Sequence, residues 1–282
     1  MKVYEALNLA KRMLDNSSTP QLDAEVLLSN LLEKDRVYLY INRDKELSED
    51  VLNKFLSKIE RRKKGEPVSY ITGYKEFMSL NFKVKEGVLI PRPDTEILVE
   101  KVLENVKDIK SPIIVDVGCG SGAISVSIAR YKKDAIVYAL DIMDIPLEVT
   151  KENSKLNGVE EKVIVLKSDI LKGLSKELYG KVDVIVSNPP YIRGEVIPNL
   201  MEDVKNYEPY EALYGGEDGL YFYKNITKES MPFLKDNGFI AYEIGHDQGY
   251  DVQNILKNSG FYKTLCFKDL AGHDRAVLGW RM

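Results

Sequence analysis

The chain has 282 residues, 44% of them hydrophobic, and its 40 basic and 44 acidic residues leave a formal net charge of -4. This is enough material for two folded domains, and the lack of a positive overall charge argues against a protein dedicated to binding DNA or RNA. Residues 1–15 mix charged and apolar side chains and no apolar run reaches membrane length, so we expect a cytoplasmic protein without a signal peptide or membrane contact.

The first seventy residues show the spacing of amphipathic helices. Three groups of apolar residues carry it, which are Val3, Ala6, Leu7, Ala10, Met13 and Leu14, then Leu27, Leu28, Leu31 and Leu32 after Pro20, then Val51, Leu52, Phe55, Leu56 and Ile59. Ser48 is suited to begin the last helix, and the basic run 61–64 before Gly65 is suited to end it. We interpret that run as a solvated helix terminus, with contact to an acidic partner as the alternative.

An α/β sheet is predicted further along the chain. Residues 75–88 alternate loosely between apolar and polar side chains, as in a β-hairpin. Apolar runs suited to strands then follow at 113–117, 135–140, 163–166, 182–186, 238–244, 262–267 and 276–280. Because the first four are nearly continuous and lie about a helix length apart, they indicate a mainly parallel, seven-stranded sheet with helices on both faces.

A glycine-rich loop follows the first strand of this sheet. Its residues are Asp116, Val117, Gly118, Cys119, Gly120, Ser121, Gly122 and Ala123. The string also fits the dinucleotide-binding fingerprint, so on its own it does not identify the ligand. A carboxylate at Asp116 would repel a pyrophosphate and attract the ammonium group of a methionine moiety, which favours S-adenosyl-L-methionine.

Carboxylates at the ends of the next two strands complete an adenosine site. Asp141 ends the second strand, where it can accept hydrogen bonds from both ribose hydroxyls. Asp169 and Ile170 follow the third strand, where they can meet the amino group and the ring of adenine. For Asp169, a helix cap or a surface turn is an equally open interpretation.

The two cysteines, Cys119 and Cys266, lie far apart, and neither has a histidine near it in the sequence. We therefore expect no disulfide and no metal site. No base is spaced to activate Cys119, so we interpret it as a small loop residue and not as a nucleophile.

The fourth strand ends in Asn188, Pro189, Pro190 and Tyr191. Two successive prolines cannot continue a central strand, so they form a rigid turn at its carboxyl end, although such a tetrapeptide also occurs as an ordinary turn. The turn presents the Asn188 amide oxygen and the Pro189 carbonyl as two acceptors, and Tyr191 offers a flat face. These features predict a socket for a planar NH2 group.

An amide or aryl amine nitrogen is a weak nucleophile because its lone pair is delocalised. Accepting both of its N–H bonds directs the lone pair at the methyl group and stabilises the positive charge that develops on nitrogen. We expect catalysis to come mainly from positioning, since a sulfonium is a good leaving group.

With these motifs the chain resembles the release factor glutamine methyltransferase family, known as PrmC or HemK, over nearly its whole length. The matching segments, besides the glycine loop and residues 188–191, are 65–68, 73–77, 90–96, 207–209, 215–219 and 269–275. Residues 188–191 are shared with adenine-N6 methyltransferases, so Ile90-Pro-Arg-Pro-Asp-Thr-Glu96 carries the assignment. Cys119, where threonine is common, and residues 144–146 depart mildly from the pattern.

The resemblance implies a helical domain for substrate recognition at 1–72, a β-hairpin linker at 73–90 and a methyltransferase domain at 91–282 whose last strand is antiparallel. It implies methylation of the side-chain N5 nitrogen of the glutamine in the Gly-Gly-Gln loop of class 1 peptide chain release factors. The cofactor would lie against Gly118, Cys119, Gly120, Ser121, Gly122, Asp141, Asp169, Ile170 and Asn188. The glutamine would bind Asn188, Pro189, Pro190 and Tyr191, and Asn188, Pro189 and Tyr191 would be the catalytic residues.

Three other functions remain as alternatives. An adenine-N6 methyltransferase acting on DNA or RNA is disfavoured by the acidic balance. A nicotinamide-dependent oxidoreductase is disfavoured by Asp116, and a non-catalytic adaptor with the same fold remains open. Pro91, Arg92 and Pro93 could border the active site, but Pro93 with residues 94–96 also suits an ordinary helix start, so we assign them no catalytic role. His273 and Arg275 lie in a loop between the last two strands, and we interpret them as structural.

Overall fold

The computed structural model describes residues 1–282, and its contacts divide them into two units. The first unit contains residues 1–74 and 201–207, and the second contains residues 75–200 and 208–282. None of the helices is both long enough and apolar enough to span a membrane.

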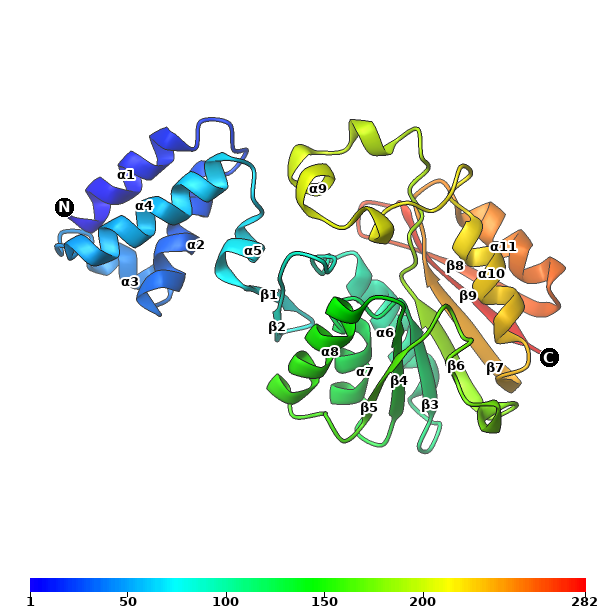
Figure 1. The fold of residues 1–282 in the computed structure, drawn as a ribbon. Coiled ribbons are helices and arrows are strands. Elements are labelled where there is room, and N and C mark those ends of the chain that lie inside the picture. Colours follow the sequence, from blue (N-terminus) through cyan, green and yellow to red (C-terminus); the bar gives the residue numbers. More distant parts are fainter. The chain divides into compact units, whose positions relative to one another are not determined.

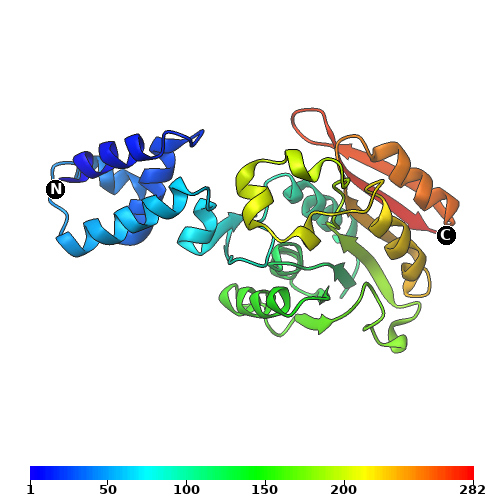
Figure 2. The same cartoon turned by 45° about the horizontal axis from the view of Figure 1, so that its top comes forward.

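The first unit is helical, as predicted (Figure 2). Its elements are α1 (Val3–Met13), α2 (Pro20–Leu32), α3 (Arg36–Ile41), α4 (Glu49–Lys63), α5 (Val68–Thr72) and α9 (Glu202–Tyr207). The predicted apolar groups form its core, in which Ala6, Leu27, Phe55 and Ile59 have no exposed surface. The two short helices α3 and α5 were not predicted, because five or six residues are too few to show a helical period.

The ends of α4 confirm its predicted limits but correct one interpretation. The Ser48 hydroxyl accepts the Val51 amide at the start, and Gly65 adopts a positive φ after the end. The basic run is not simply solvated, because the Arg62 Nε lies 2.7 Å from Asp23 Oδ2 and both side chains are largely buried. Arg62 therefore joins α4 to α2 within the first unit.

Segment 201–207 belongs to the first unit although it is distant in sequence. The Tyr207 hydroxyl donates to the Lys64 carbonyl at 2.9 Å, and its ring lies beside Gly65. No sequence pattern around either residue predicts this contact.

The second unit contains the predicted seven-stranded sheet. Its strands are β3 (Ile113–Val117), β4 (Ile136–Asp141), β5 (Val163–Lys167), β6 (Val182–Ser187), β7 (Leu234–Glu243), β8 (Phe261–Lys268) and β9 (Asp274–Arg281). They are ordered β5-β4-β3-β6-β7-β9-β8. The first five in this order are parallel, and β9 runs antiparallel to β7 and β8 (Figure 1). The fold class and the antiparallel last strand are confirmed.

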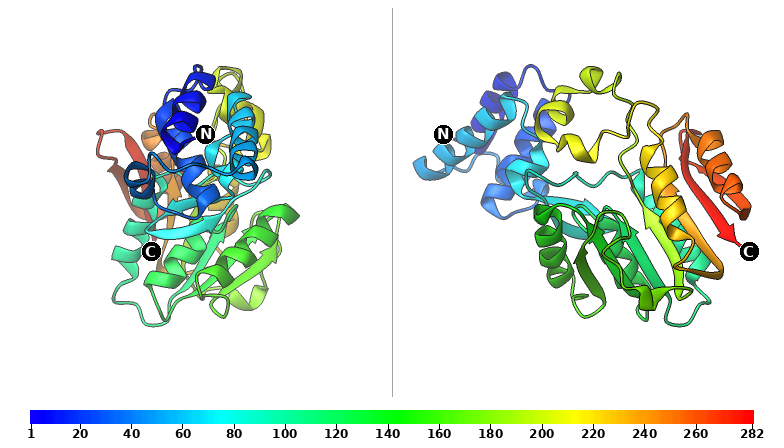
Figure 3. Two further views of the ribbon diagram at one scale, coloured as in Figure 1. Left: turned by 90° about the vertical axis from the view of Figure 1, so that its left-hand side faces the viewer. Right: turned by 45° about the vertical axis from the view of Figure 1, so that its right-hand side comes forward.

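Helices cover both faces of this sheet. One apolar core joins it to α6 (Thr95–Val106), α7 (Ala123–Tyr131) and α8 (Asp144–Leu156). A second core on the other face joins it to α10 (Tyr221–Ser230) and α11 (Gly249–Asn258), which pack against each other (Figure 3, right). Alternate residues such as Ile114 and Val115 enter opposite cores, so the central strands are buried on both sides.

Smaller elements complete the unit. The hairpin of β1 (Tyr74–Phe77) and β2 (Leu80–Lys83) begins at the unit boundary, and β2 packs on α8 through hydrogen bonds between the Lys83 backbone and Asn153. Short 3-10 helices lie at Lys176–Leu178, Ile197–Asn199 and Tyr210–Ala212.

Candidate active site

A cavity of about 590 Å³ opens at the carboxyl ends of β3, β4, β5 and β6. This is where ligands bind in open parallel sheets, and the volume suits a cofactor-sized molecule. Segment 87–95, the loops after the four strands and the start of α10 line it.

The cavity brings together most of the predicted site residues. Those lining it are Gly118, Cys119, Gly120, Ser121, Asp141, Asp169, Ile170, Asn188, Pro189 and Pro190. Gly122 and Tyr191 are not part of the lining. One cavity thus holds both the predicted adenosine site and the predicted acceptor turn.

The glycine loop has a backbone that other residues rarely adopt. Gly118, Gly120 and Gly122 have φ values of 75°, 55° and 78°. The amides of Gly118 and Cys119 donate to the Leu140 carbonyl, and the Gly120 amide donates to Asp141 Oδ2. These amides hold the loop on β4 and are already occupied, unlike the free amides that a pyrophosphate requires.

Asp116 lies behind the loop and has no exposed surface. Its Oδ2 accepts the backbone amide and the hydroxyl of Ser125 in the first turn of α7, and its Oδ1 is buried without a partner. Burial raises its pKa to about 7. Asp116 is not part of the cavity lining, so the expectation that it meets a ligand at the mouth of the loop is wrong: its carboxyl group lies inside the protein, against the start of α7.

Asp141 lines the cavity at the end of β4. Its Oδ2 accepts the Gly120 amide at 3.1 Å and its Oδ1 accepts the Met143 amide at 3.0 Å. Burial is the main cause of its raised pKa. Each carboxylate oxygen can accept a second bond, so both remain able to receive ribose hydroxyls.

The end of the cavity beside β5 suits a flat apolar ring. Ile170, with φ 53°, lies in the lining together with Ile142, Phe222 and Ile226. The exposed carboxylate of Asp169 pairs with Lys172. Phe222 and Tyr221, which also lines the cavity, were not predicted, because α10 is separated from the glycine loop by about a hundred residues.

Cys119 behaves as a small loop residue. Burial raises the pKa of its thiol well above the ordinary value, and its sulfur lies 3.4 Å from the Thr150 hydroxyl oxygen. A thiol held protonated in this way is a poor nucleophile.

The acceptor turn is anchored on β6 and α6. The Ser187 hydroxyl donates to the Val117 carbonyl at 2.6 Å, which ties the end of β6 to β3. The Asn188 Nδ2 donates to Thr95 Oγ1 at 3.3 Å, and this is the hydrogen bond that holds the side chain. Its Oδ1 remains free to accept an N–H group from a ligand. Thr95 was missed because residues 93–96 were interpreted as a helix start.

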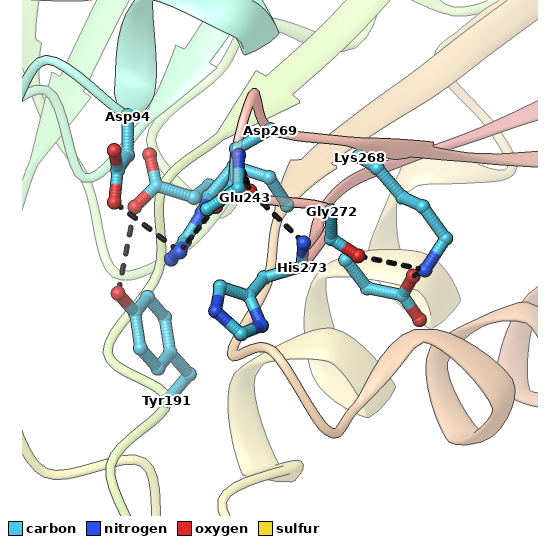
Figure 4. Close-up of polar contacts among 10 residues, drawn as sticks. Asp94, Tyr191, Glu243, Lys268, Asp269, Gly272 and His273 are labelled. Carbon is cyan, nitrogen blue, oxygen red and sulfur yellow. Dashed lines mark hydrogen bonds and ion pairs between the residues drawn. The ribbon is translucent and has the colours of Figure 1, made fainter.

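Tyr191 supports the turn from behind. Its ring packs against the second core, and its hydroxyl donates to Glu243 Oε1 at 3.5 Å (Figure 4). Burial raises the pKa of this hydroxyl, so it stays protonated. The Gln248 Nε2 donates to the Tyr191 carbonyl at 3.2 Å and fixes the backbone as well.

Segment 215–219 braces the same turn. The Gly215 amide donates to the Ile192 carbonyl at 2.9 Å. A Cβ on Gly215 would lie 2.6 Å from the Tyr191 Cα and 2.8 Å from the Pro190 carbonyl oxygen, so only glycine permits this approach. The glycines of this segment thereby gain a physical role at the site.

Arg92 borders the cavity near the acceptor turn. Its Nη2 pairs with the Oε1 of Glu208, whose side chain is 2% exposed. Residues 92 and 208 come from two separate sequence motifs, which this ion pair connects.

Charged side chains surround the Tyr191 hydroxyl, and of these Glu243 is the most deeply buried. Glu243 ends β7 and is 2% exposed, and burial raises its pKa to about 7. The Arg275 Nη2 lies 3.2 Å from Asp94 Oδ2 and 3.0 Å from Asp269 Oδ2. Figure 4 shows Asp94, Tyr191 and Glu243 converging beside the Asp269 loop. Arg275 has the structural surroundings expected for it, whereas Glu243 was missed within an apolar run.

Comparisons with known proteins identify the family and the fold. Residues 5–73 match the family model of the PrmC N-terminal domain, and residues 93–205 match that of the methyltransferase small domain. Among solved structures, the catalytic domain of hMettl16 in complex with MAT2A 3'UTR hairpin 6 has a TM-score of 0.59 and 15% identity, covering 83% of this chain and 82% of that chain. The N-terminal domain of human METTL16 in complex with SAH has a TM-score of 0.54 and 17% identity, covering 90% of this chain and 93% of that one. These likenesses show the fold alone.

Sequence relatives are much closer. The release factor glutamine methyltransferase of Clostridium botulinum is 50% identical over 91% of this chain and 90% of its own length. That of Clostridium acetobutylicum is 47% identical over 100% of this chain and 99% of its own length. The chain therefore belongs to the release factor glutamine methyltransferase family.

Proposed function

We propose that this S-adenosyl-L-methionine-dependent methyltransferase modifies the side-chain N5 nitrogen of the glutamine in the Gly-Gly-Gln loop of class 1 peptide chain release factors, and thereby modulates translation termination. The observation that carries the proposal is the Asn188 side chain, which lines the same cavity as the glycine loop and keeps its Oδ1 free to accept a hydrogen bond. Membership of the family supports this choice of substrate.

The residues present fit the adenosyl cofactor. Asp141 would hold the ribose, Ile170 and Phe222 would flank the adenine, and residues 118–121 would face the methionine part. Behind the loop, Asp116 Oδ1 is a buried acceptor without a partner, and an acceptor oxygen there favours a cationic group over a phosphate. S-adenosyl-L-methionine supplies, when bound, a methyl group on a positively charged sulfur.

The chain's own residues would position the glutamine amide. Asn188 Oδ1 and the Pro189 carbonyl each accept one N–H, and the rigid proline turn holds both acceptors in place. Fixed acceptors of this kind stabilise the charge that develops on nitrogen, an effect worth about 10²- to 10³-fold in rate for one group. Tyr191 stabilises the turn through Glu243, in place of the flat wall that the sequence suggested.

We propose that residues 1–72 recognise the protein substrate, residues 73–90 form a linker and residues 91–282 form the catalytic domain. The match of residues 5–73 to the PrmC N-terminal domain supports the first of these assignments. Deleting residues 1–72 should raise the KM for release factor and leave affinity for S-adenosylhomocysteine unchanged.

Incubating the protein with cofactor carrying a labelled methyl group tests the function. When a release factor and structured RNA or DNA are present together, the protein should transfer label to the release factor alone. A release factor in which glutamate replaces the glutamine of the Gly-Gly-Gln loop should stay unlabelled. Label found only on nucleic acid would establish the adenine-N6 alternative. No transfer to either would favour the adaptor.

A further inference from the structure

Arg92 is the only cationic residue in the lining of the cavity. The other residues there with ionisable side chains that can carry a full charge are acidic, namely Asp141, Asp169 and Glu211. Acidic groups attract the sulfonium and ammonium groups of the adenosyl cofactor and disfavour its carboxylate. The carboxylate of the methionine moiety therefore has one favourable neighbour in this lining, which is Arg92.

The backbone amides of the glycine loop offer little to this carboxylate. The amides of residues 118–120 and 122 already donate to the carbonyls of Leu140 and Cys119 and to the Asp141 carboxylate. The Ser121 amide remains, but a neutral donor forms a weaker bond to a carboxylate than a guanidinium does. Arg92 is thus the strongest donor that the cavity presents to an anion.

The buried side chain of Glu208 holds the guanidinium of Arg92 at the cavity. Arg92 Nη2 donates to Glu208 Oε1, and the Glu208 side chain is 2% exposed whereas that of Arg92 is 37% exposed. A guanidinium has five N–H donors in a planar fork, so the donors on Nε and Nη1 remain for a ligand. Because the guanidinium is fixed before a ligand arrives, binding costs less side-chain entropy.

The place of Arg92 along the cavity agrees with the direction in which the cofactor would lie. The Arg92 carbonyl accepts the Thr95 amide at 3.1 Å, and the Thr95 hydroxyl oxygen accepts from Asn188, which follows β6. The proposed adenine site lies beside β5, which is three strand spacings from β6, or about 14 Å. An adenosine held at Asp141 would therefore extend its methionine tail past the glycine loop toward Arg92.

We infer that Arg92 binds the carboxylate of the cofactor's methionine moiety and makes the cavity specific for adenosyl compounds that carry an amino acid tail. Glu208 is the positioning residue for this guanidinium. The inference rests on the proposed placement of the cofactor and not on the proposed protein substrate. It gives the ion pair between the two sequence motifs a role in ligand selection.

Calorimetric titration of the full chain with two ligands tests the inference. S-adenosylhomocysteine carries the carboxylate, and its decarboxylated form, S-adenosyl-3-thiopropylamine, has the same adenosine and ammonium groups without it. The wild type should bind S-adenosylhomocysteine about 10- to 100-fold more tightly, as expected for a charge-assisted hydrogen bond. Arg92→Gln should remove this preference by weakening S-adenosylhomocysteine, while affinity for the decarboxylated ligand changes less than about threefold.

Two control variants separate carboxylate binding from a purely structural role. Glu208→Gln weakens the link to Arg92 but keeps the guanidinium, so it should retain the preference for S-adenosylhomocysteine. Lys172→Met removes a positive charge that pairs with Asp169 at the other end of the cavity, so it should leave the preference unchanged. Melting temperatures show whether each variant is folded.

Equal losses of affinity for the two ligands in Arg92→Gln would overturn the inference, and so would an equal loss of preference in Glu208→Gln or in Lys172→Met. A wild type that binds both ligands equally would overturn it too. If Arg92→Gln does not fold because Glu208 loses its cation, the double variant Arg92→Gln, Glu208→Gln decides, with Glu208→Gln as its reference. A wild type that binds neither ligand would overturn the proposed cofactor site as well. No methyl acceptor is present, so the proposed protein substrate is tested separately.

Discussion

The two ends of the cavity are built in different ways. The cofactor end is built mainly from local segments at strand ends, with a glycine loop held on β4 by its own amides and the Asp141 carboxylate at the end of β4. The acceptor end consists of side chains from separated segments, in which Asn188 is held by Thr95, and Tyr191 by Glu243 and Gln248.

Because the two ends are built differently, we expect cofactor affinity and the rate of methyl transfer to depend on different residues. We expect the glycine loop and Asp141 at the cofactor end to set affinity for the adenosyl ligand, and the side-chain network at the acceptor end to position the substrate nitrogen. Changes at one end should therefore leave the property of the other end nearly unchanged.

The largest effect is expected from Asn188→Ala. Removing one of the two fixed acceptors should lower kcat about 10²- to 10³-fold, because it stabilises charge only in the transition state. Affinity for S-adenosylhomocysteine, measured by calorimetry, should change less than about threefold, since a single hydrogen bond at the far end of the site is lost. A comparable loss of cofactor affinity would mean that the two ends are one functional unit.

Gly215→Ala tests the backbone behind the acceptor turn. Its new methyl group would press on the Tyr191 Cα and the Pro190 carbonyl, and a displacement of about 1 Å can cost up to about 10²-fold in rate. The matched control is Gly194→Ala, whose Cβ would meet only side-chain atoms, with Tyr214 Cε2 at 3.2 Å. Similar rates for both variants would show that the turn needs no such brace.

Asp141→Asn tests the cofactor end. An asparagine has one acceptor oxygen in place of two, so either the Gly120 or the Met143 amide loses its partner. Affinity for S-adenosylhomocysteine should fall about tenfold, while kcat at saturating cofactor stays near the wild-type value. The control is Asp144→Asn, an exposed residue paired with Lys167 outside the cavity. A lower kcat with unchanged cofactor affinity would show that Asp141 acts on the rate of transfer and not on cofactor binding.

The smallest effect is expected in the pH dependence of the free energy of unfolding. Burial raises the pKa values of Asp116 and Glu243 to about 7, so the folded protein keeps protons that the unfolded chain releases above its ordinary carboxyl pKa. Their contribution to stability is full at low pH and is lost as pH rises through 7, and it should lower the free energy of unfolding by about 1 kcal/mol or more between pH 5 and pH 8. Urea denaturation should show a weaker pH dependence in Asp116→Asn, but not in the exposed control Asp236→Asn.

The two ends of the cavity also differ in how well the sequence predicts them. The glycine loop, Asp141 and the strands are local patterns, so the sequence places them well along the chain. Phe222, Thr95 and Glu243 meet the site through contacts between distant segments, which no periodicity encodes. Asp116 was placed at the right loop but on the wrong side of it, because one residue's register along β3 decides whether a side chain faces ligand or helix.

The internal carboxylate of Asp116 has a consequence for competition inside a cell. ATP and NAD contain the same adenosine moiety that this cavity would accommodate. Both also carry phosphates, which bind at the exposed N-terminus of a helix. In this fold that place is already taken by the carboxyl group of Asp116, which accepts the Ser125 amide and hydroxyl at the start of α7. Discrimination against abundant nucleotides is thus part of the folded scaffold itself, and redirecting the scaffold to a nucleotide cofactor would have to begin by replacing Asp116.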